Sequence, residues 1–159
     1  MLWERVPHVI ERLRIMVSPQ RLGNPIKYIV LNLIACGIER VPDQLNLLLP
    51  ALRSVLLALQ GVHNLGYAHR DVRWPNVLYV SDEDWRLIDF ENSSLGDSEF
   101  MNNDMRMVGE MMSYCNSLVS TSDILASLRD KLLSEAPPDA SEALAILARV
   151  SIPCPLIQL

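Results

Sequence analysis

The stretch that decides the fold is HRDVRWPN at residues 69–76, followed by WRLIDF at residues 85–90. Three oxygen-bearing side chains stand out in it: Asp71, Asn76 five positions later, and Asp89 eighteen positions after Asp71. Two carboxylates and one neutral amide in so short a span are candidate ligands for a hard metal ion.

The segments on either side of an acidic turn predict a β-hairpin that brings these side chains together. Residues 77–80 and 86–88 have the apolar and aromatic composition of short strands, and residues 81–84 between them are typical of a turn. Such a hairpin would fold Asn76 and Asp89 back to one edge, beside the preceding loop. The sequence therefore predicts a small cluster of oxygen ligands, one of them neutral.

A cluster of this kind suits phosphoryl transfer from a nucleotide. Mg²⁺ prefers oxygen ligands, takes one or two from the protein, and completes its octahedron with phosphates and waters. A carboxylate and an amide supply these ligands without excess negative charge near the triphosphate. A further carboxylate away from the metal can accept or orient the proton of the attacking hydroxyl.

These residues resemble the catalytic core of the protein kinase superfamily. The HRD tripeptide that ends at Asp71, together with Asn76, is similar to its catalytic loop, and Asp89–Phe90 is similar to its magnesium-binding motif. The resemblance implies that the cofactors are ATP and Mg²⁺. It also implies that Asp71 is the catalytic base and that Asn76 and Asp89 are the metal ligands.

The same resemblance implies roles for the neighbouring basic residues. Arg73 would contact the transferring phosphate, and Arg70 would brace the segment that follows Asp89. His69 is interpreted as architectural, packing and hydrogen-bonding so that the loop keeps its shape.

One departure points to a particular branch of the superfamily. Protein kinases place a glycine after the DF pair, whereas this chain has Glu91, similar to the choline kinase and aminoglycoside phosphotransferase branch. Only fourteen residues separate Asp89 from Asp104, and no A-P-E-like motif is present. The chain is therefore expected to have no loop for activating phosphorylation and little platform for a peptide.

Downstream, Asp104 and Gly109 resemble the family's buried helix, whose aspartate hydrogen-bonds the catalytic loop from below. A helix is expected to begin near Asn103, so a simple capping role for Asp104 is an open alternative. A core stripe is expected on this helix at Met105, Val108 and Met112. His63, on an apolar helical face, is interpreted as a core histidine rather than a ligand.

The N-terminal part resembles the end of a kinase small lobe. Residues 13–17 and 27–34 predict two strands joined by a turn at 19–25. The expected domains are 1–37, a remnant of the small lobe, and 38–159, a kinase-like large lobe. The resemblance implies a hinge that binds the nucleotide through Leu33, Ile34, Ala35 and Cys36.

Much of the small lobe is missing from the sequence. No G-x-G-x-x-G loop precedes the first predicted strand, and the two lysines, Lys27 and Lys131, do not lie in a V-A-I-K-like strand. The lysine that pairs with the α- and β-phosphates in protein kinases therefore has no candidate. A truncated kinase that is weak or inactive alone is the expectation.

The rest of the chain predicts helices and their caps. Pro50 suits the first turn of a helix over residues 52–63, and Asp43 can cap a short helix before it. A capping-box-like pair, Ser120 and Asp123, is expected to open a helix over residues 124–133. Asp139 and Glu142 are expected to open the last helix. The fold class is α/β in the broad sense (α+β), a truncated kinase-like fold.

Composition excludes several classes of protein. The formal net charge of −5 and the absence of a basic, aromatic-rich patch argue against nucleic acid as a partner. The three scattered cysteines form neither a disulfide framework nor a metal pattern. The start lacks a signal-peptide layout, and the longest apolar run, residues 29–37, is too short to span a bilayer. An intracellular, cytoplasmic protein without a membrane partner is expected.

Three functions stay open from the sequence. The first is a protein-kinase-type phosphotransferase, favoured by Arg70 and the WPN sequence at residues 74–76. The second is a small-molecule kinase of the choline or aminoglycoside type, favoured by Glu91 and the short stretch after it. The third is a non-catalytic, pseudokinase-like binding module, favoured by the missing lysine and glycine loop. The partners would be a nucleotide and, for an enzyme, a hydroxyl-bearing protein or small molecule.

Overall fold

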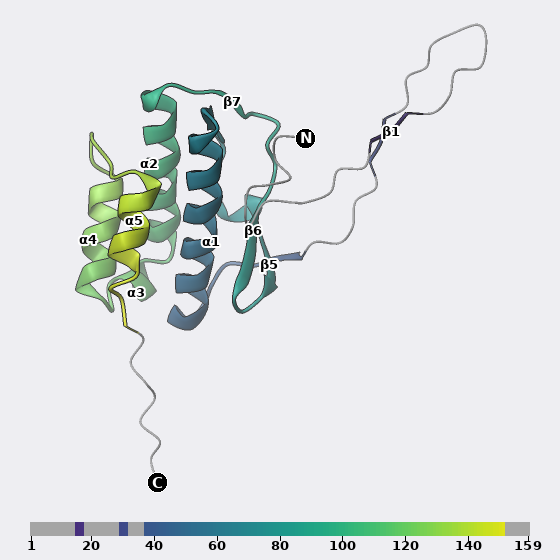
Figure 1. Cartoon of the computed structure of the whole chain (residues 1–159). Helices are drawn as coiled ribbons and strands as arrows, with labels where there is room; N and C mark the ends of the chain where they lie inside the picture. The colour runs from purple at the N-terminus through teal and green to yellow at the C-terminus, as the bar shows by residue number, and fades with distance from the viewer. Residues whose placement is uncertain (1–14, 18–28, 32–36, 152–159) are drawn as a thin grey trace, which may run out of the picture.

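A computed structural model describes residues 15–17, 29–31 and 37–151 of the 159-residue chain. These residues form a mixed α+β fold, with five α-helices and small antiparallel sheets (Figure 1). The α+β class expected from the sequence is therefore confirmed at this level.

The strands are short and the helices carry most of the described chain. The strands are β1 (Ile15–Val17), β2 (Ile29–Leu31), β3 (Ile38–Glu39), β4 (Tyr67–Ala68), β5 (Val77–Ser81), β6 (Asp84–Leu87) and β7 (Ser94–Leu95). The helices are α1 (Leu45–Asn64), α2 (Ser98–Tyr114), α3 (Asn116–Val119), α4 (Asp123–Leu132) and α5 (Ala140–Leu147), with a 3-10 turn, η2, at Trp74–Asn76.

The predicted hairpin after the 69–76 loop is present. Strands β5 and β6 pair antiparallel, with Val77 opposite Leu87 and Ser81 opposite Asp84 at the turn. Strand β3 adds to the outer edge of β5, so the sheet order is β3-β5-β6. The hairpin therefore returns the chain from Asn76 to Asp89 at one end of this sheet.

Gly37 marks the entry to this sheet and cannot be replaced freely. Its φ is +154°, and an added Cβ would lie 2.4 Å from the backbone oxygen of Tyr79. This close approach lets β3 reach β5, because only glycine lacks the atom that would collide there.

Strands β1 and β2 lie inside the two N-terminal strands expected from the sequence. They pair antiparallel, with Ile15 opposite Leu31. The remainder of residues 13–34 and the predicted hinge residues Leu33, Ile34, Ala35 and Cys36 lie outside the described residues.

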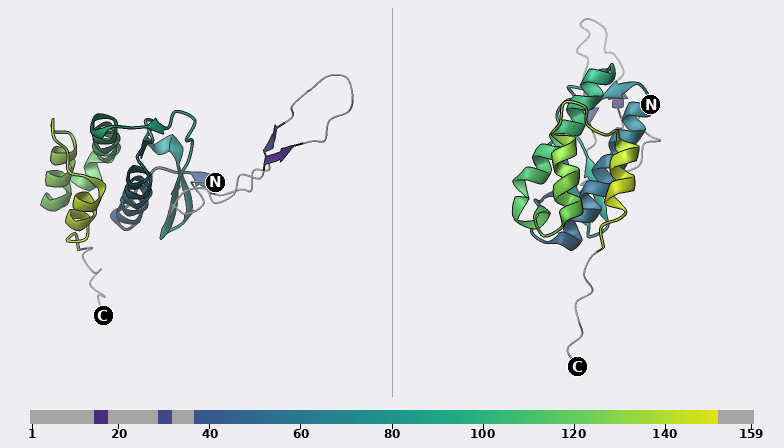
Figure 2. Two further views of the ribbon diagram at one scale, coloured as in Figure 1. Left: turned by 45° about the horizontal axis from the view of Figure 1, so that its top comes forward. Right: turned by 90° about the vertical axis from the view of Figure 1, so that its left-hand side faces the viewer.

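Helix α1 is at the centre of the fold. It packs against β6 on one side and α5 on the other, while α2 packs against α4 (Figures 1 and 2). Its inward face consists of apolar residues at helical spacing, nearly all fully buried: Leu48, Leu52, Val55, Leu56, Leu59 and Val62. Burying these side chains fixes the C-terminal end of α1, which leads through β4 into the 69–76 loop.

The start of helix α1 differs from the expectation. Helix α1 is one helix from Leu45, with Pro50 in its second turn, because the buried Leu47 and Leu48 extend the apolar face before the proline. Asp43 does not cap it. Instead, the Asp43 carboxylate accepts a hydrogen bond from Arg40 at 3.4 Å, and the N-cap is Gln44.

Helix α2 begins at Ser98 rather than near Asn103. The Asp97 side chain caps it by accepting from the backbone N–H groups of Glu99 and Phe100 at 3.1 and 3.2 Å. Asp104 is therefore an interior helical residue, and the alternative of a simple cap is wrong. The predicted core stripe of Met105, Val108 and Met112 is buried.

The N-cap of helix α4 differs from the expectation, whereas that of α5 agrees with it. Helix α4 is capped by Ser122, whereas Ser120 donates its hydroxyl to the Asn116 carbonyl of the preceding helix. Asp139 and Glu142 form the predicted capping box at the start of α5.

The hairpin is fixed to the core by aromatic rings. Trp85 on β6 is fully buried, with its ring centroid 6.5 Å from that of Trp74 and 5.1 Å from that of Tyr79. Trp74 also donates its indole N–H to the Met111 carbonyl at 3.0 Å. These contacts hold both ends of the Asn76 turn against the helices.

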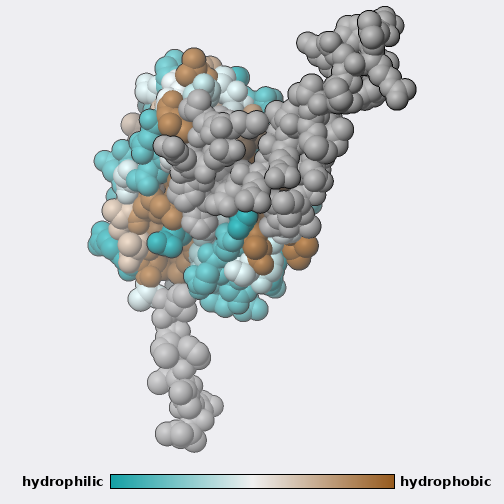
Figure 3. Space-filling model, turned by 45° about the vertical axis from the view of Figure 1, so that its right-hand side comes forward, coloured by the Kyte–Doolittle hydropathy of each residue, from teal (hydrophilic) through white to brown (hydrophobic). Residues whose placement is uncertain are grey.

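Two further features concern the surface and the possibility of a membrane span. Helix α1 alone among the described residues is long and apolar enough to cross a membrane by length and composition, but 10 of its 20 residues are buried in the fold. Brown apolar patches interrupt the hydrophilic surface in Figure 3. Among the residues whose burial is described, the most exposed large apolar side chains are Tyr114, Leu95 and Ile38.

Candidate active site

The predicted partners Asp71 and Asn76 are in direct contact. The amide nitrogen of Asn76 donates to the Asp71 backbone carbonyl and to its carboxylate, both at 2.8 Å. Asn76 is 5% exposed because the 3-10 turn η2 tucks it beneath the loop. With the amide nitrogen committed to Asp71, the oxygen Oδ1 is left as the acceptor that a cation could use.

Asp89 is tied to the same loop through the residue before it. The Ile88 N–H donates to the Asn76 carbonyl at 2.9 Å, and the Ile88 carbonyl accepts from the His69 ring at 2.9 Å. Asp89 itself is exposed at the end of the hairpin, with φ at +64°. The structure thus brings Asp71, Asn76 and Asp89 to one edge of the fold.

His69 is the packing residue around which this edge is built. The Asp71 N–H donates to its Nδ1 at 3.2 Å, so Nδ1 must be the acceptor and Nε2 must carry the proton donated to Ile88. Burial lowers the pKa of His69, while the Ile88 carbonyl and the charges of Asp104, Asp71 and Asp89 oppose this effect. A neutral ring at pH 7 fits this hydrogen-bond pattern.

Asp104 holds the loop from the helix below. Its carboxylate is fully buried and accepts from the backbone N–H groups of His69 and Arg70, both at 2.7 Å. It also accepts from Nε2 of His63 at 2.9 Å. His63 is therefore the satisfied core histidine that the sequence predicted, and Asp104 occupies the place expected from the resemblance.

Arg70 joins the loop to the segment after Asp89. Its guanidinium donates to the Ser94 hydroxyl at 3.3 Å and lies 4.8 Å from the centre of the Phe100 ring. Its φ is +72°, in the left-handed region that is costly for a side chain of this size. The hydrogen bond from its N–H to Asp104 helps to hold this conformation.

The segment between Asp89 and α2 is closed against the start of the loop. Strand β7 pairs with β4, and the Gly96 N–H donates to the Gly66 carbonyl at 3.0 Å. A Cβ on Gly96 would lie only 2.9 Å from that of Ala68, so glycine permits this contact. Glu91 is exposed in a turn at the start of the same segment.

Arg73, expected to contact the transferring phosphate, is paired with the Asp71 carboxylate. Its Nε is 3.1 Å from an oxygen of Asp71, and its side chain is 59% exposed. The guanidinium is therefore at the open side of the loop, where an anionic group of a ligand could also meet it.

Sequence reasoning missed Met107. The Val72 N–H donates to the Met107 thioether sulfur at 3.4 Å. Met107 lies one helical turn after Asp104 on α2, so the same helix face accepts hydrogen bonds from three loop amides. A methionine carries no sequence signal of this role, because its side chain is read as an apolar core residue.

The oxygen donors suit a hard divalent cation. Asp89 provides an exposed carboxylate and Asn76 an amide oxygen. These are two ligands, and Mg²⁺ usually takes one or two from the protein. Within the described ranges, no three His, Cys, Asp or Glu side chains gather in a metal-binding group. The fit therefore depends on the mixed pair of a carboxylate and an amide.

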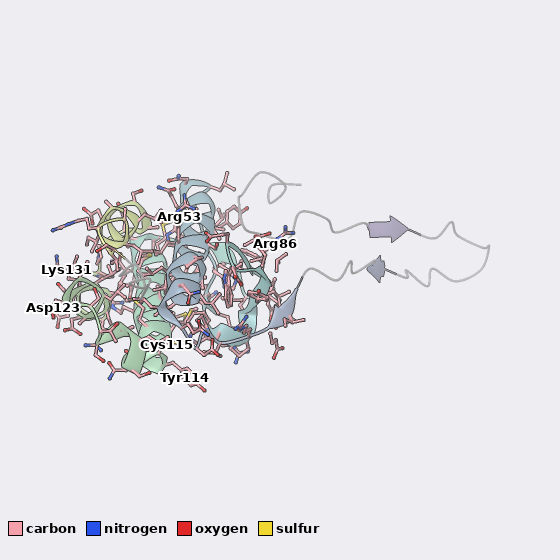
Figure 4. The ribbon with its side chains drawn as sticks, turned by 90° about the horizontal axis from the view of Figure 1, so that it is seen from below. Arg53, Arg86, Tyr114, Cys115, Asp123 and Lys131 are labelled. Atoms are coloured by element: carbon pink, nitrogen blue, oxygen red, sulfur yellow. The ribbon has the colours of Figure 1, made fainter. Side chains whose placement is uncertain are left out.

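No lysine of the described part of the chain reaches this edge. Lys131 lies on α4, on the other side of α1 from the hairpin that carries Arg86 (Figure 4). Lys27 lies outside the described residues. A cavity of about 490 Å³ between α1, the β5–β6 turn and α5, and another of about 300 Å³ beside His63, contain neither Asp71 nor Asp89 in their walls.

Comparison with known proteins gives a partial match. No protein-family model matches this chain. Over 69 residues it is 39% identical to Crinkler effector protein 8 of Phytophthora infestans, a match that covers 43% of this chain and 12% of that protein. The chain therefore spans only a small part of the length of this curated relative.

Proposed function

We propose that this chain is part of an ATP-dependent, Mg²⁺-requiring phosphotransferase of the protein-kinase-like type. The observation that carries the proposal is the double hydrogen bond from the Asn76 amide to Asp71. It orients one carboxylate toward a substrate and one amide oxygen toward a cation, two tasks that phosphoryl transfer needs side by side. The Asp104 contacts to His69 and Arg70 support it, because they fix the backbone of this loop.

Each side chain has a role in this proposal. The Asp71 carboxylate, 26% exposed, accepts a hydrogen bond from the acceptor hydroxyl and takes its proton. Asn76 Oδ1 and Asp89 would hold Mg²⁺, which would neutralise charge on the phosphates. Arg73 moves from Asp71 to the transferring phosphate. The hinge residues 33–36 would hold the adenine.

A small hydroxyl- or amine-bearing acceptor is the second candidate, favoured by the closed segment after Asp89. The β4–β7 pairing, the Gly96–Gly66 hydrogen bond and the contact from Arg70 to Ser94 hold this segment against the loop. Little of it is left to support an extended peptide. A non-catalytic nucleotide-binding module is the third candidate, favoured by the lack of a lysine in a V-A-I-K-like strand and of a G-x-G-x-x-G loop.

The first prediction concerns Asp71 and Asp89. Removing the charge in Asp71→Asn is expected to lower the phosphotransfer rate on the order of 10²-fold or more, because a positioned base contributes roughly 10²- to 10⁴-fold. Asp89→Asn is expected to lower the rate as well, because the proposed metal site then loses its carboxylate ligand. The measurement is transfer of label from γ-labelled ATP, with Mg²⁺, to mixed Ser/Thr/Tyr peptides and, separately, to choline and an aminoglycoside.

The matched control is Asp123→Asn, which makes the same chemical change on α4, far from the site (Figure 4). It should retain full activity. Label on peptides alone would exclude the small-molecule candidate. Nucleotide binding without turnover, unchanged in Asp71→Ala, would reject catalysis and favour the binding module.

A further inference from the structure

The backbone N–H groups of the loop around Asp71 donate to a small set of acceptors. The N–H groups of His69 and Arg70 meet the Asp104 carboxylate, and that of Asp71 meets the His69 ring. The next N–H, of the buried Val72, meets only the sulfur of Met107. Thioether sulfur is a weak acceptor, so this is the weakest link in the set.

The Met107 sulfur is also open to chemical change. Five methionine side chains are described, all on α2, and three of them, Met105, Met111 and Met112, are buried. Met101 and Met107 are partly exposed. Among the described methionines, Met101 and Met107 are therefore the ones that a small oxidant in solution reaches first, and of these two only Met107 bonds the loop.

We propose that Met107 is a positioning residue for the Asp71 loop and an oxidation site through which peroxide lowers the activity. In the reaction, one oxygen of H₂O₂ is transferred to the sulfur, and the proton on that oxygen passes to the other oxygen. The O–O bond breaks, an S–O bond forms, and water leaves, so the sulfur loses two electrons and the peroxide gains them. The product is methionine sulfoxide.

Oxidation moves the acceptor as well as strengthening it. The sulfoxide oxygen lies one bond further out than the sulfur that Val72 contacts at 3.4 Å. The Val72 N–H can bond this oxygen only if the loop backbone shifts, and Asp71 is the adjacent residue. A displacement of about 1 Å at a reacting group can cost on the order of 10²-fold in rate. The effect on activity rests on the proposed phosphotransfer; the contact itself does not.

The experiment treats the folded chain with H₂O₂ and measures three quantities. Peptide mass mapping locates the sulfoxide, ¹H–¹⁵N spectra follow the Val72 and Asp71 amides, and γ-phosphate transfer gives the activity. We expect oxidation at Met101 and Met107, a large shift of the Val72 resonance, and an activity loss of at least tenfold. Treatment with methionine sulfoxide reductases should reverse the last two changes.

Two matched variants assign the effect. Leucine conserves volume but has no acceptor, so in Met107→Leu peroxide should change neither the Val72 amide nor the activity. Met101→Leu, on the same helix, should respond as the wild type does. If Met107→Leu responds to peroxide like the wild type, or if Met107 resists oxidation while Met101 reacts, the proposal is overturned.

The two proposals can fail separately. A Met107-dependent shift of Val72 in a protein that shows no phosphotransfer at all, in any of its forms, would reject the function while supporting the contact. Activity that survives complete oxidation of Met107 would reject the positioning role while leaving phosphotransfer intact.

Discussion

The buried Asp104 carboxylate accepts hydrogen bonds from His69 N–H, Arg70 N–H and the His63 ring. In Asp104→Asn, the amide oxygen can accept only part of these hydrogen bonds. The amide NH₂ group then faces at least one of the three donors, which loses its acceptor. An unsatisfied buried donor costs about 1–3 kcal/mol. We expect the free energy of unfolding in urea to fall by about that amount.

The control for this prediction is Asp130→Asn, which removes an exposed carboxylate paired with Arg129 at 2.7 Å. Exposed ion pairs of this kind contribute about 1 kcal/mol or less. A loss in Asp104→Asn no larger than in Asp130→Asn would contradict the role given to Asp104.

His69 makes stability depend on pH in a defined direction. Burial lowers its pKa in the folded protein below the ordinary value of 6.5. As the pH falls below about 6.5, the unfolded chain binds a proton at this ring before the folded chain does, so stability decreases. The decrease stops once the pH is below the folded pKa.

The measurement compares urea unfolding of wild type and His69→Gln between pH 7.5 and 5. The glutamine has no titrating ring, so the variant should lose this contribution, up to about 1.4 kcal/mol per pH unit. Equal pH slopes for the two proteins would show that His69 is not buried in its neutral form.

At the scale of elements, the β3–β5 contact depends on Gly37. A Cβ there would lie 2.4 Å from the Tyr79 carbonyl oxygen and would also have an unfavourable φ. Gly37→Ala is expected to lower the free energy of unfolding by about 1–3 kcal/mol. Protection of the β5 amides against hydrogen exchange should fall with it.

Gly109→Ala provides the same substitution in another setting. Its nearest new neighbours are the Leu133 side-chain ends at 3.0 Å, which are partly exposed and can move, and alanine favours a helix. It should cost less than Gly37→Ala. The reverse order would contradict the close approach of the two strands.

The elements that were predicted correctly carry long or strongly patterned signals. The α1 face repeats apolar residues over several turns, and the Asp139–Glu142 capping box has a fixed spacing. Strands β4 and β7 have two residues each, too few for a pattern, and only tertiary pairing defines them. The start of α2 was missed because the polar run Asn102, Asn103 and Asp104 separates Phe100 and Met101 from the apolar stripe that begins at Met105.

The site was predictable to a similar extent. Asp71 and Asn76 are five residues apart in a recognisable motif, so their contact followed from the sequence. The link of Asp89 to the loop runs through backbone groups of Ile88, which no side-chain pattern encodes. The Met107 contact was missed for the reason given above, and the roles of all these residues stay predictions.

At the scale of the whole molecule, the buried apolar core of the described residues lies between Leu47 and Leu147. A shortened chain of residues 37–151 is therefore expected to unfold in one cooperative transition with its Trp74 and Trp85 environment intact, measured by near-UV circular dichroism. Because residues 33–36 would be absent, it should also lose any Mg·ATP binding that the full chain shows, measured by calorimetry.

A shortened chain that fails to fold would contradict the first half of this prediction. One that folds and binds Mg·ATP as tightly as the full chain would contradict the hinge. The 1–37 and 38–159 division expected from the sequence is tested by the same pair of proteins.

The hydrogen bond between Gly66 and Gly96 has a consequence for the local unfolding of this region. Asp71, Asn76 and Asp89 all lie on the stretch of chain between these two glycines, and the hairpin within that stretch packs against α1. Loss of the Gly66–Gly96 hydrogen bond alone therefore leaves the hairpin in place. The three side chains should lose their arrangement together only when the β4–β7 pairing and the contact of β6 with α1 open as one cooperative unit of local unfolding.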